Sequence, residues 1–163
     1  MLAVLLALVG AGLVLAVARA GARPAALSAR PPVAVPTDLP AAEVLRSWDA
    51  QRAAAYAAGS VRMLRDLYVA GSRAGRADLR LLRAWTGRGL RVEGLRTQVL
   101  GLGVVSQRPD RLVLRVTDRL VAGEAVGEAG VTRLPRDRAD TRILTLARGS
   151  DGAWRVAAVR PVG

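Results

Sequence analysis

The chain of 163 residues contains no cysteine and no histidine, and these two absences exclude several kinds of chemistry. Without cysteine there is no disulfide, no thiol nucleophile, no lipoprotein anchor and no thiolate metal site. Without histidine there is no Ser-His-Asp triad, and the commonest general base and metal ligand is missing. Only carboxylates, tyrosines and arginines remain for proton transfer. The sequence also lacks a phosphate loop, a nucleophile elbow and calcium-loop spacing of acids, so it predicts neither a cofactor nor a metal site.

Lysine and asparagine are also absent, and the 25 arginines give a net charge of +12. This joint absence is typical of GC-rich codon usage, so the choice of arginine alone says little about function. A strongly basic chain favours anionic partners such as lipid head groups, wall polymers or nucleic acid. The arginines are dispersed, however, and Trp48, Trp85 and Trp154 are expected in the core rather than as platforms on which bases stack. We therefore expect no specific nucleic-acid binding.

The N-terminal residues 1–20 contain an uninterrupted apolar run from Leu2 to Ala18. As a helix this run spans about 26 Å at ~1.5 Å per residue, close to the ~30 Å hydrocarbon core of a bilayer. It is therefore predicted to be a transmembrane helix. A signal peptide is the second interpretation, because Ala18-Arg19-Ala20 matches the A-x-A cleavage pattern. A buried core helix is the third, and it is disfavoured because the run has no polar face.

Two sequence features predict opposite sides of the membrane for the rest of the chain. Arg19, Arg23 and Arg30 follow the apolar run, and the positive-inside rule would then keep the rest of the chain in the cytoplasm. The cleavage-like motif favours export, and we expect a membrane-anchored domain outside the cytoplasm. Residues 21–40 are rich in alanine and proline and lack periodicity, which predicts a semi-extended linker.

Residues 41–163 show helical periodicity first and strand periodicity afterwards. Apolar residues at three- and four-residue spacing predict helices at Ala41–Ala58, Val61–Tyr68 and Arg76–Trp85. Alternating patterns and turn residues then predict strands at Val92–Gln107, Arg111–Leu120, Thr141–Ala147 and Ala153–Val159. Residues 122–140 are predicted to be a mobile loop with a short strand near Val131–Leu134. This order indicates an α+β fold with the helices packed on one face of a bent antiparallel sheet.

One residue breaks the alternation of the central strand. Asp118 falls on the apolar face of Arg111–Leu120, and a buried carboxylate needs a partner or a raised pKa. One interpretation makes Asp118 an acid or base in a pocket. The other pairs it with an arginine, which is the commoner arrangement for a buried charge.

Residues 41–163 resemble the NTF2-like (cystatin-like, SnoaL-like) superfamily, which has membrane-anchored members in actinobacteria. Three parts of the chain carry the resemblance: Leu45–Ser60 as the long first helix, Val61–Tyr68 with Gly71-Ser72 as the second helix and turn, and the strands Arg111–Leu120 and Asp151-Gly-Ala-Trp-Arg-Val156. The resemblance implies a cone of three helices closing a bent antiparallel sheet. Some members are isomerases, dehydratases or cyclases that use Asp, Tyr or His in a pocket, whereas others are catalytically silent binding or assembly domains.

The resemblance suggests two candidate catalytic residues. Tyr56 and Asp118 could imitate the Tyr/Asp oxyanion hole of the ketosteroid isomerase-like members. No second acid suits the role of the base, because Asp49 and Asp66 fall on helix faces that are expected to be solvated. The alternative is that Tyr56 and Tyr68 are core residues whose hydroxyls lie at the edge of the core.

Three hypotheses about function follow. The first is a membrane-tethered, non-catalytic domain that binds a protein partner or forms a homodimer through its sheet. The second is a small-molecule enzyme or binding pocket of the isomerase/dehydratase kind that uses Tyr56 and Asp118. The third is a basic scaffold on anionic lipid or cell-wall polymer.

Overall fold

The computed structural model describes residues 39–162. The predicted membrane segment and all but the last two residues of the predicted linker lie outside this range. Three helices come first: α1 (Leu39–Ala57), α2 (Val61–Arg65) and α3 (Arg73–Thr86). None of the three combines the length and the apolar character that a membrane span requires.

Serine caps set the starts of the two shorter helices. The hydroxyl of Ser60 accepts a hydrogen bond from the Met63 amide at 3.3 Å, and the hydroxyl of Ser72 accepts one from the Gly75 amide at 3.2 Å. Each bond satisfies an amide that has no partner within its helix. The cap at Ser72 starts α3 at Arg73, earlier than the sequence periodicity predicted.

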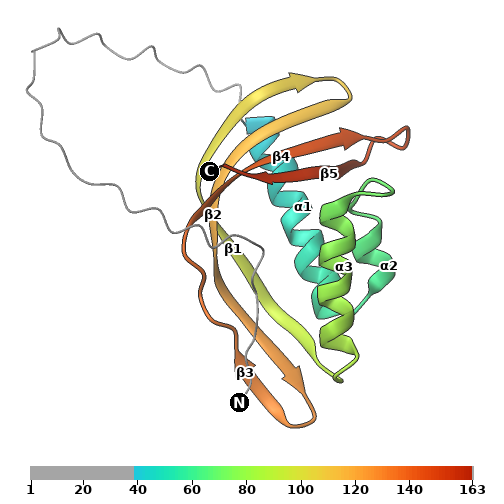
Figure 1. Cartoon of the computed structure of the whole chain (residues 1–163), viewed down its shortest axis with the longest axis vertical. Helices are drawn as coiled ribbons and strands as arrows, with labels where there is room; N and C mark the ends of the chain where they lie inside the picture. Colours follow the sequence, from blue (N-terminus) through green and yellow to red (C-terminus); the bar gives the residue numbers. More distant parts are fainter. Residues whose placement is uncertain (1–38, 163) are drawn as a thin grey trace, which may run out of the picture. The chain divides into compact units, whose positions relative to one another are not determined.

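Five antiparallel strands follow: β1 (Arg91–Arg108), β2 (Arg111–Gly127), β3 (Gly130–Arg133), β4 (Asp140–Arg148) and β5 (Trp154–Pro161). The strand order is β1-β2-β4-β5, and β3 pairs with the last part of β2. The long β1–β2 hairpin bends strongly, and the helices lie on its concave side (Figure 1). This is the α+β architecture that the sequence predicted.

The prediction of a loop over residues 122–140 was wrong for residues 122–127, whereas residues 134–139 belong to no strand. β2 continues to Gly127, because Ala122, Ala125 and Val126 pair with the start of β1 and Glu124–Gly127 pair with β3. The glycines and small side chains of this segment weaken the alternating pattern, and the pairing on both sides compensates. The short strand expected near residues 131–134 is confirmed as β3.

The core lies between the helices and the concave face of the sheet. Its fully buried side chains come from both layers: Leu64 and Leu82 from the helices, and Val92, Leu114, Val116, Leu144, Leu146 and Val156 from the strands. Trp48 and Trp85 are buried as predicted, whereas Trp154 is only partly buried. The segment after α2 is tied to β5 by backbone hydrogen bonds: Val69 donates to Val156 and Val156 donates to Leu67.

Candidate functional site

The helical layer contains a buried cluster of four polar residues, here called the Asp78 cluster. Asp78 lies on α3, Arg52 and Tyr56 lie on α1, and Tyr68 follows α2. Arg52 donates to the Asp78 carboxylate from Nε at 2.7 Å and from Nη2 at 2.6 Å. The hydroxyls of Tyr56 and Tyr68 each donate to it at 2.7 Å. Four donors therefore converge on one carboxylate, of which only 5% is exposed.

Local sequence spacing explains part of this arrangement. Arg52 and Tyr56 are four residues apart, so they share one face of α1. The Arg52 guanidinium lies 4.9 Å from the centroid of the Tyr56 ring, which adds a cation–π contact. Asp78 precedes Leu82 and Trp85 by four and seven residues, so it lies on the buried stripe of α3. Helix geometry thus explains the shared face of Arg52 and Tyr56 and the place of Asp78 on α3, whereas Tyr68 reaches the cluster from the segment after α2.

The electrostatics of the cluster fix its protonation state. Burial raises the pKa of Asp78, but the ion pair with Arg52 and the hydrogen bonds from Arg52, Tyr56 and Tyr68 outweigh burial, and the net pKa is lowered. Burial and the Asp78 charge raise the pKa values of Tyr56 and Tyr68 well above the ordinary value. The carboxylate therefore stays ionised, and both tyrosines stay protonated as donors.

These contacts suit a structural role. The carboxylate accepts two bonds on each oxygen, which leaves little capacity for a substrate. Neither of the two surface cavities described below is lined by a member of the cluster. The cluster instead joins α1, α3 and the segment after α2 through one buried charge.

Asp118 lies elsewhere, on the concave face of β2. Its carboxylate pairs with the Arg142 guanidinium from β4, which was one of the two interpretations drawn from the sequence. Burial raises the pKa of Asp118, Arg142 opposes this effect, and the charges of Asp49 and Asp140 add to it, so the net pKa is raised. The Arg142 Nε is buried without a hydrogen-bond partner in the described residues.

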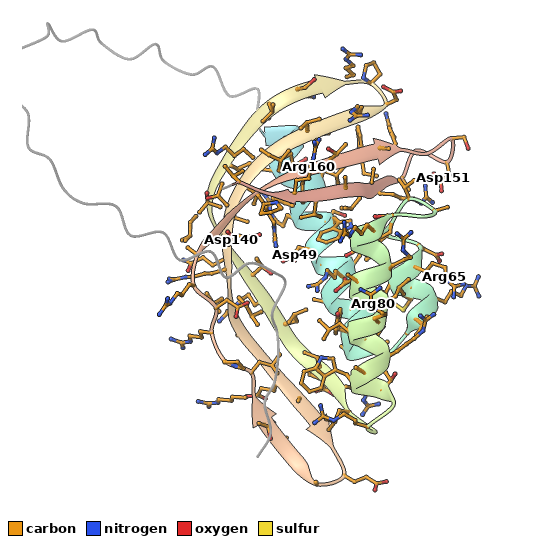
Figure 2. The ribbon with its side chains drawn as sticks, in the orientation of Figure 1. Asp49, Arg65, Arg80, Asp140, Asp151 and Arg160 are labelled. Carbon is orange, nitrogen blue, oxygen red and sulfur yellow. The ribbon has the colours of Figure 1, made fainter. Side chains whose placement is uncertain are left out.

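Asp49 is not the solvated helix residue that the sequence suggested. It lies on α1 where the helix passes the sheet (Figure 2), is half-buried, and accepts a hydrogen bond from the Thr97 hydroxyl at 3.2 Å. Asp66, at the end of α2, is exposed as expected. The concave face of the sheet therefore carries a second, smaller polar group around Asp118, and it is distinct from the Asp78 cluster.

The structure does not bring Tyr56 and Asp118 together. The Tyr56 hydroxyl donates to Asp78, and Asp118 pairs with Arg142. Sequence reasoning missed Arg52 and Asp78, the two charged members of the first cluster. The signal was present: Asp78 breaks the apolar stripe of α3 in the same way that Asp118 breaks the apolar face of β2.

Two surface cavities lie outside these clusters. One is an open groove of about 380 Å³ between α1, the end of α2 and the β4–β5 turn, and Trp48 and Trp154 are among its lining residues. The other, of about 230 Å³, lies beside β2, and three of its six lining residues are arginines. Within residues 39–162, no three acidic residues lie close enough to hold a metal ion.

Comparison with known proteins gives matches by structure alone. No protein-family model and no curated protein matches the sequence. The intermembrane space region of the chloroplast protein ARC6 is similar in structure, with 15% identity over 76% of this chain and 95% of that chain, at a TM-score of 0.51. Aln2 from a Streptomyces species matches with 16% identity over 76% and 91% of the two chains, also at 0.51. At these identities the likeness concerns the fold alone.

Proposed function

We propose that this chain, whose α+β architecture resembles that of the NTF2-like superfamily, is a membrane-tethered binding domain without catalytic activity. The observation that carries the proposal is the separation of the two catalytic candidates. Tyr56 and Asp118 belong to different polar clusters, and each is held by a charged partner of its own. Neither surface cavity is lined by either residue.

The alternative, an isomerase- or dehydratase-like enzyme, requires both groups to reach one ligand atom. A ligand that used Tyr56 would have to replace its bond to Asp78, whose carboxylate is almost fully buried. A ligand that used Asp118 would have to displace Arg142. Both steps would break charge-assisted hydrogen bonds, which are among the stronger polar contacts in a protein. The contacts therefore favour binding over catalysis.

The outer edge of β1 supports a role in protein binding. Within residues 39–162, β1 pairs only with β2, so no strand covers its other edge. The residues between Arg96 and Arg108 carry no charge. Val99, Leu100 and Val105 in this stretch are 46–60% exposed. An uncharged, apolar edge of this length is a site where a second chain binds readily.

Two bulges shape this edge. The pairing with β2 shifts around Leu100 and again around Val105, so both residues are left out of the ladder. Bulges hinder the addition of a further regular strand. We therefore propose that the partner, either another protein or a second copy of the chain, packs against the exposed side chains of β1.

The proposed tether is the apolar run of residues 2–18, followed by a linker of residues 21–38, since α1 begins at Leu39. In extended form the linker would separate the domain from the bilayer by up to about 55 Å at ~3.1 Å per residue. This distance suits a domain that binds a partner beyond the membrane surface. We propose that the domain lies outside the cytoplasm.

The outward face of β2 supports a second candidate function. Arg111, Arg115 and Arg119 alternate along it and are exposed. A basic scaffold on anionic lipid or wall polymer would use this face. Such attachment would weaken steeply with salt, because attraction between exposed charges is screened over about 10 Å at 0.1 M ionic strength.

The binding proposal is tested by the size of the detergent-extracted complex. Val105→Glu places a charge on the β1 edge, and Met63→Glu places the same charge on an exposed site of α2. We expect light scattering after size exclusion to show a smaller particle for the Val105 variant and an unchanged particle for the Met63 variant. A particle of monomer mass for the native chain, or equal behaviour of the two variants, would count against the proposal.

A further inference from the structure

The smaller cavity lies where the pairing of β1 and β2 is irregular. The register between the two strands shifts between Arg96 and Thr97. The segment that leads from β3 to β4 runs back along β2 here, and the Asp137 amide donates to the Leu120 carbonyl at 3.2 Å. The cavity, of about 230 Å³, is lined by Arg96, Arg119, Leu120, Val121, Arg136 and Asp137.

Three of the six lining residues are arginines that lack a carboxylate partner. Arg52, Arg133, Arg142 and Arg155 form the ion pairs within 4.0 Å among the described residues, so the three cavity arginines form none. The Arg119 Nε donates to the Gln98 side chain at 2.9 Å, which leaves its terminal nitrogens available. Three arginines and one acid, Asp137, line this cavity, so positive charge is in excess there and favours a bound anion.

Asp137 is the acid at this cavity, and it opposes an anion. Burial raises its pKa, and no arginine contributes to that shift. Asp137 lines the same cavity as the three arginines and forms no ion pair within 4.0 Å among the described residues. A negative group at an anion site weakens binding, so removal of the Asp137 charge should raise the affinity for an anion.

We propose that Arg96, Arg119 and Arg136 form a binding site for a phosphate group, either free phosphate or the phosphomonoester of a lipid headgroup. The planar fork of guanidinium donors matches phosphate oxygens. The cavity is smaller than the roughly 300–1,000 Å³ of pockets that enclose a drug-sized ligand, so it suits a single anionic group. This site goes beyond the proposed protein partner, because it lies on other residues.

Calorimetric titration of the full-length chain in neutral detergent with inorganic phosphate tests the site. Arg136→Ala should weaken binding about tenfold, as expected for the loss of a hydrogen bond to a charged group. The matched control is Arg80→Ala, an exposed arginine on α3 (Figure 2), and it should leave the affinity unchanged. Equal weakening by the two variants, or no binding to the native chain, would overturn the proposal.

Asp137→Asn provides a test in the opposite direction. Loss of the negative charge should tighten phosphate binding several-fold, and this result would not arise from a damaged fold. Unchanged or weaker binding by a variant with native near-ultraviolet circular dichroism would overturn the assignment of Asp137 to the site. This variant also keeps the test decisive if Arg136→Ala does not fold.

The source of the phosphate is separated by vesicle flotation. Vesicles that contain phosphatidate carry a phosphomonoester, whereas phosphatidylglycerol vesicles of the same surface charge carry only a diester. Loss of phosphatidate binding by Arg136→Ala, with phosphatidylglycerol binding unchanged, supports a headgroup ligand. If the variant loses inorganic phosphate but binds both vesicles as the native chain does, a soluble phosphate is supported. If Arg80→Ala changed the binding of both lipids and of phosphate as much as Arg136→Ala does, the proposed site would be overturned.

Discussion

Replacement of Asp78 by alanine should destabilise the fold far more than replacement of any exposed acid. The carboxylate is the shared acceptor for Arg52, Tyr56 and Tyr68. Its loss leaves a charged guanidinium whose side chain is only 22% exposed, and two hydroxyls on nearly buried tyrosines. Breaking a buried ion pair by removing one partner destabilises by about 3–5 kcal/mol.

The partial exposure of Arg52 reduces this figure, and the two unpaired hydroxyls increase it. Each polar group left without a partner contributes ~1–3 kcal/mol when it cannot reach water. We therefore expect Asp78→Ala to lower the free energy of unfolding by about 4 kcal/mol, a large share of the roughly 5–15 kcal/mol of a typical domain. The assay is urea denaturation followed by tryptophan fluorescence, since Trp48 and Trp85 are buried.

One control variant and one double-mutant cycle test the reasoning behind this value. Asp66→Ala removes an exposed carboxylate and should change stability by less than about 0.5 kcal/mol. Arg52→Ala combined with Asp78→Ala should be less harmful than the sum of the single variants by roughly 2 kcal/mol, because the double variant leaves no unpaired charge. A loss below about 1 kcal/mol for Asp78→Ala, or strict additivity in the cycle, would refute the ion-pair account.

Four more results are expected. Tyr56→Phe and Tyr68→Phe should each lower stability by about 1 kcal/mol in the same urea assay, because Asp78 keeps its remaining donors; a loss as large as that of Asp78→Ala would contradict this. The lowered pKa of Asp78 means that its contribution is fully present above the unfolded-state pKa of about 3.9 and is lost as pH falls through the folded pKa. Acid titration should therefore show a stability loss below about pH 4 that is reduced in Asp78→Ala. Gly75→Ala should destabilise by about 1–3 kcal/mol despite the higher helix propensity of alanine, since an added Cβ would lie 2.7 Å from Cβ and Cγ of Tyr68; a Tm equal to or above that of the native chain would contradict this contact. Alkaline phosphatase fused to the C-terminus should be active if the domain is exported, and a stable but inactive fusion would place the domain in the cytoplasm.

Most of the element order was predictable from the sequence, because α3 and the first part of β2 each follow a clear period. The arginine-rich and leucine-rich faces of Arg111–Leu120 alternate with Asp118 as the one exception, and the structure keeps the two faces apart on β2. The last part of β2, residues 122–127, was not predictable in the same way. Its small residues and glycines resemble a loop, and pairing with β1 and β3 on both sides makes it a strand.

The polar clusters show where a single sequence stops being informative. The position of Asp118 on an apolar face indicated a buried carboxylate, but its partner Arg142 is 24 residues away and depends on the register of β2 against β4. Arg52 and Asp78 are 26 residues apart on different helices. Periodicity gives the face of each residue, whereas the partner depends on how the elements pack.

The measurement that tests the central claim most directly is site-specific photocrosslinking in living cells. A photoreactive residue at Val105 on the edge of β1 is compared with one at Arg65, which points away from the molecule on α2 (Figure 2). A binding domain that uses β1 should give one discrete adduct from position 105 and none from position 65. An adduct of twice the chain mass identifies a second copy, and any other mass identifies another protein. No adduct at position 105, or the same adducts from both positions, would contradict the account.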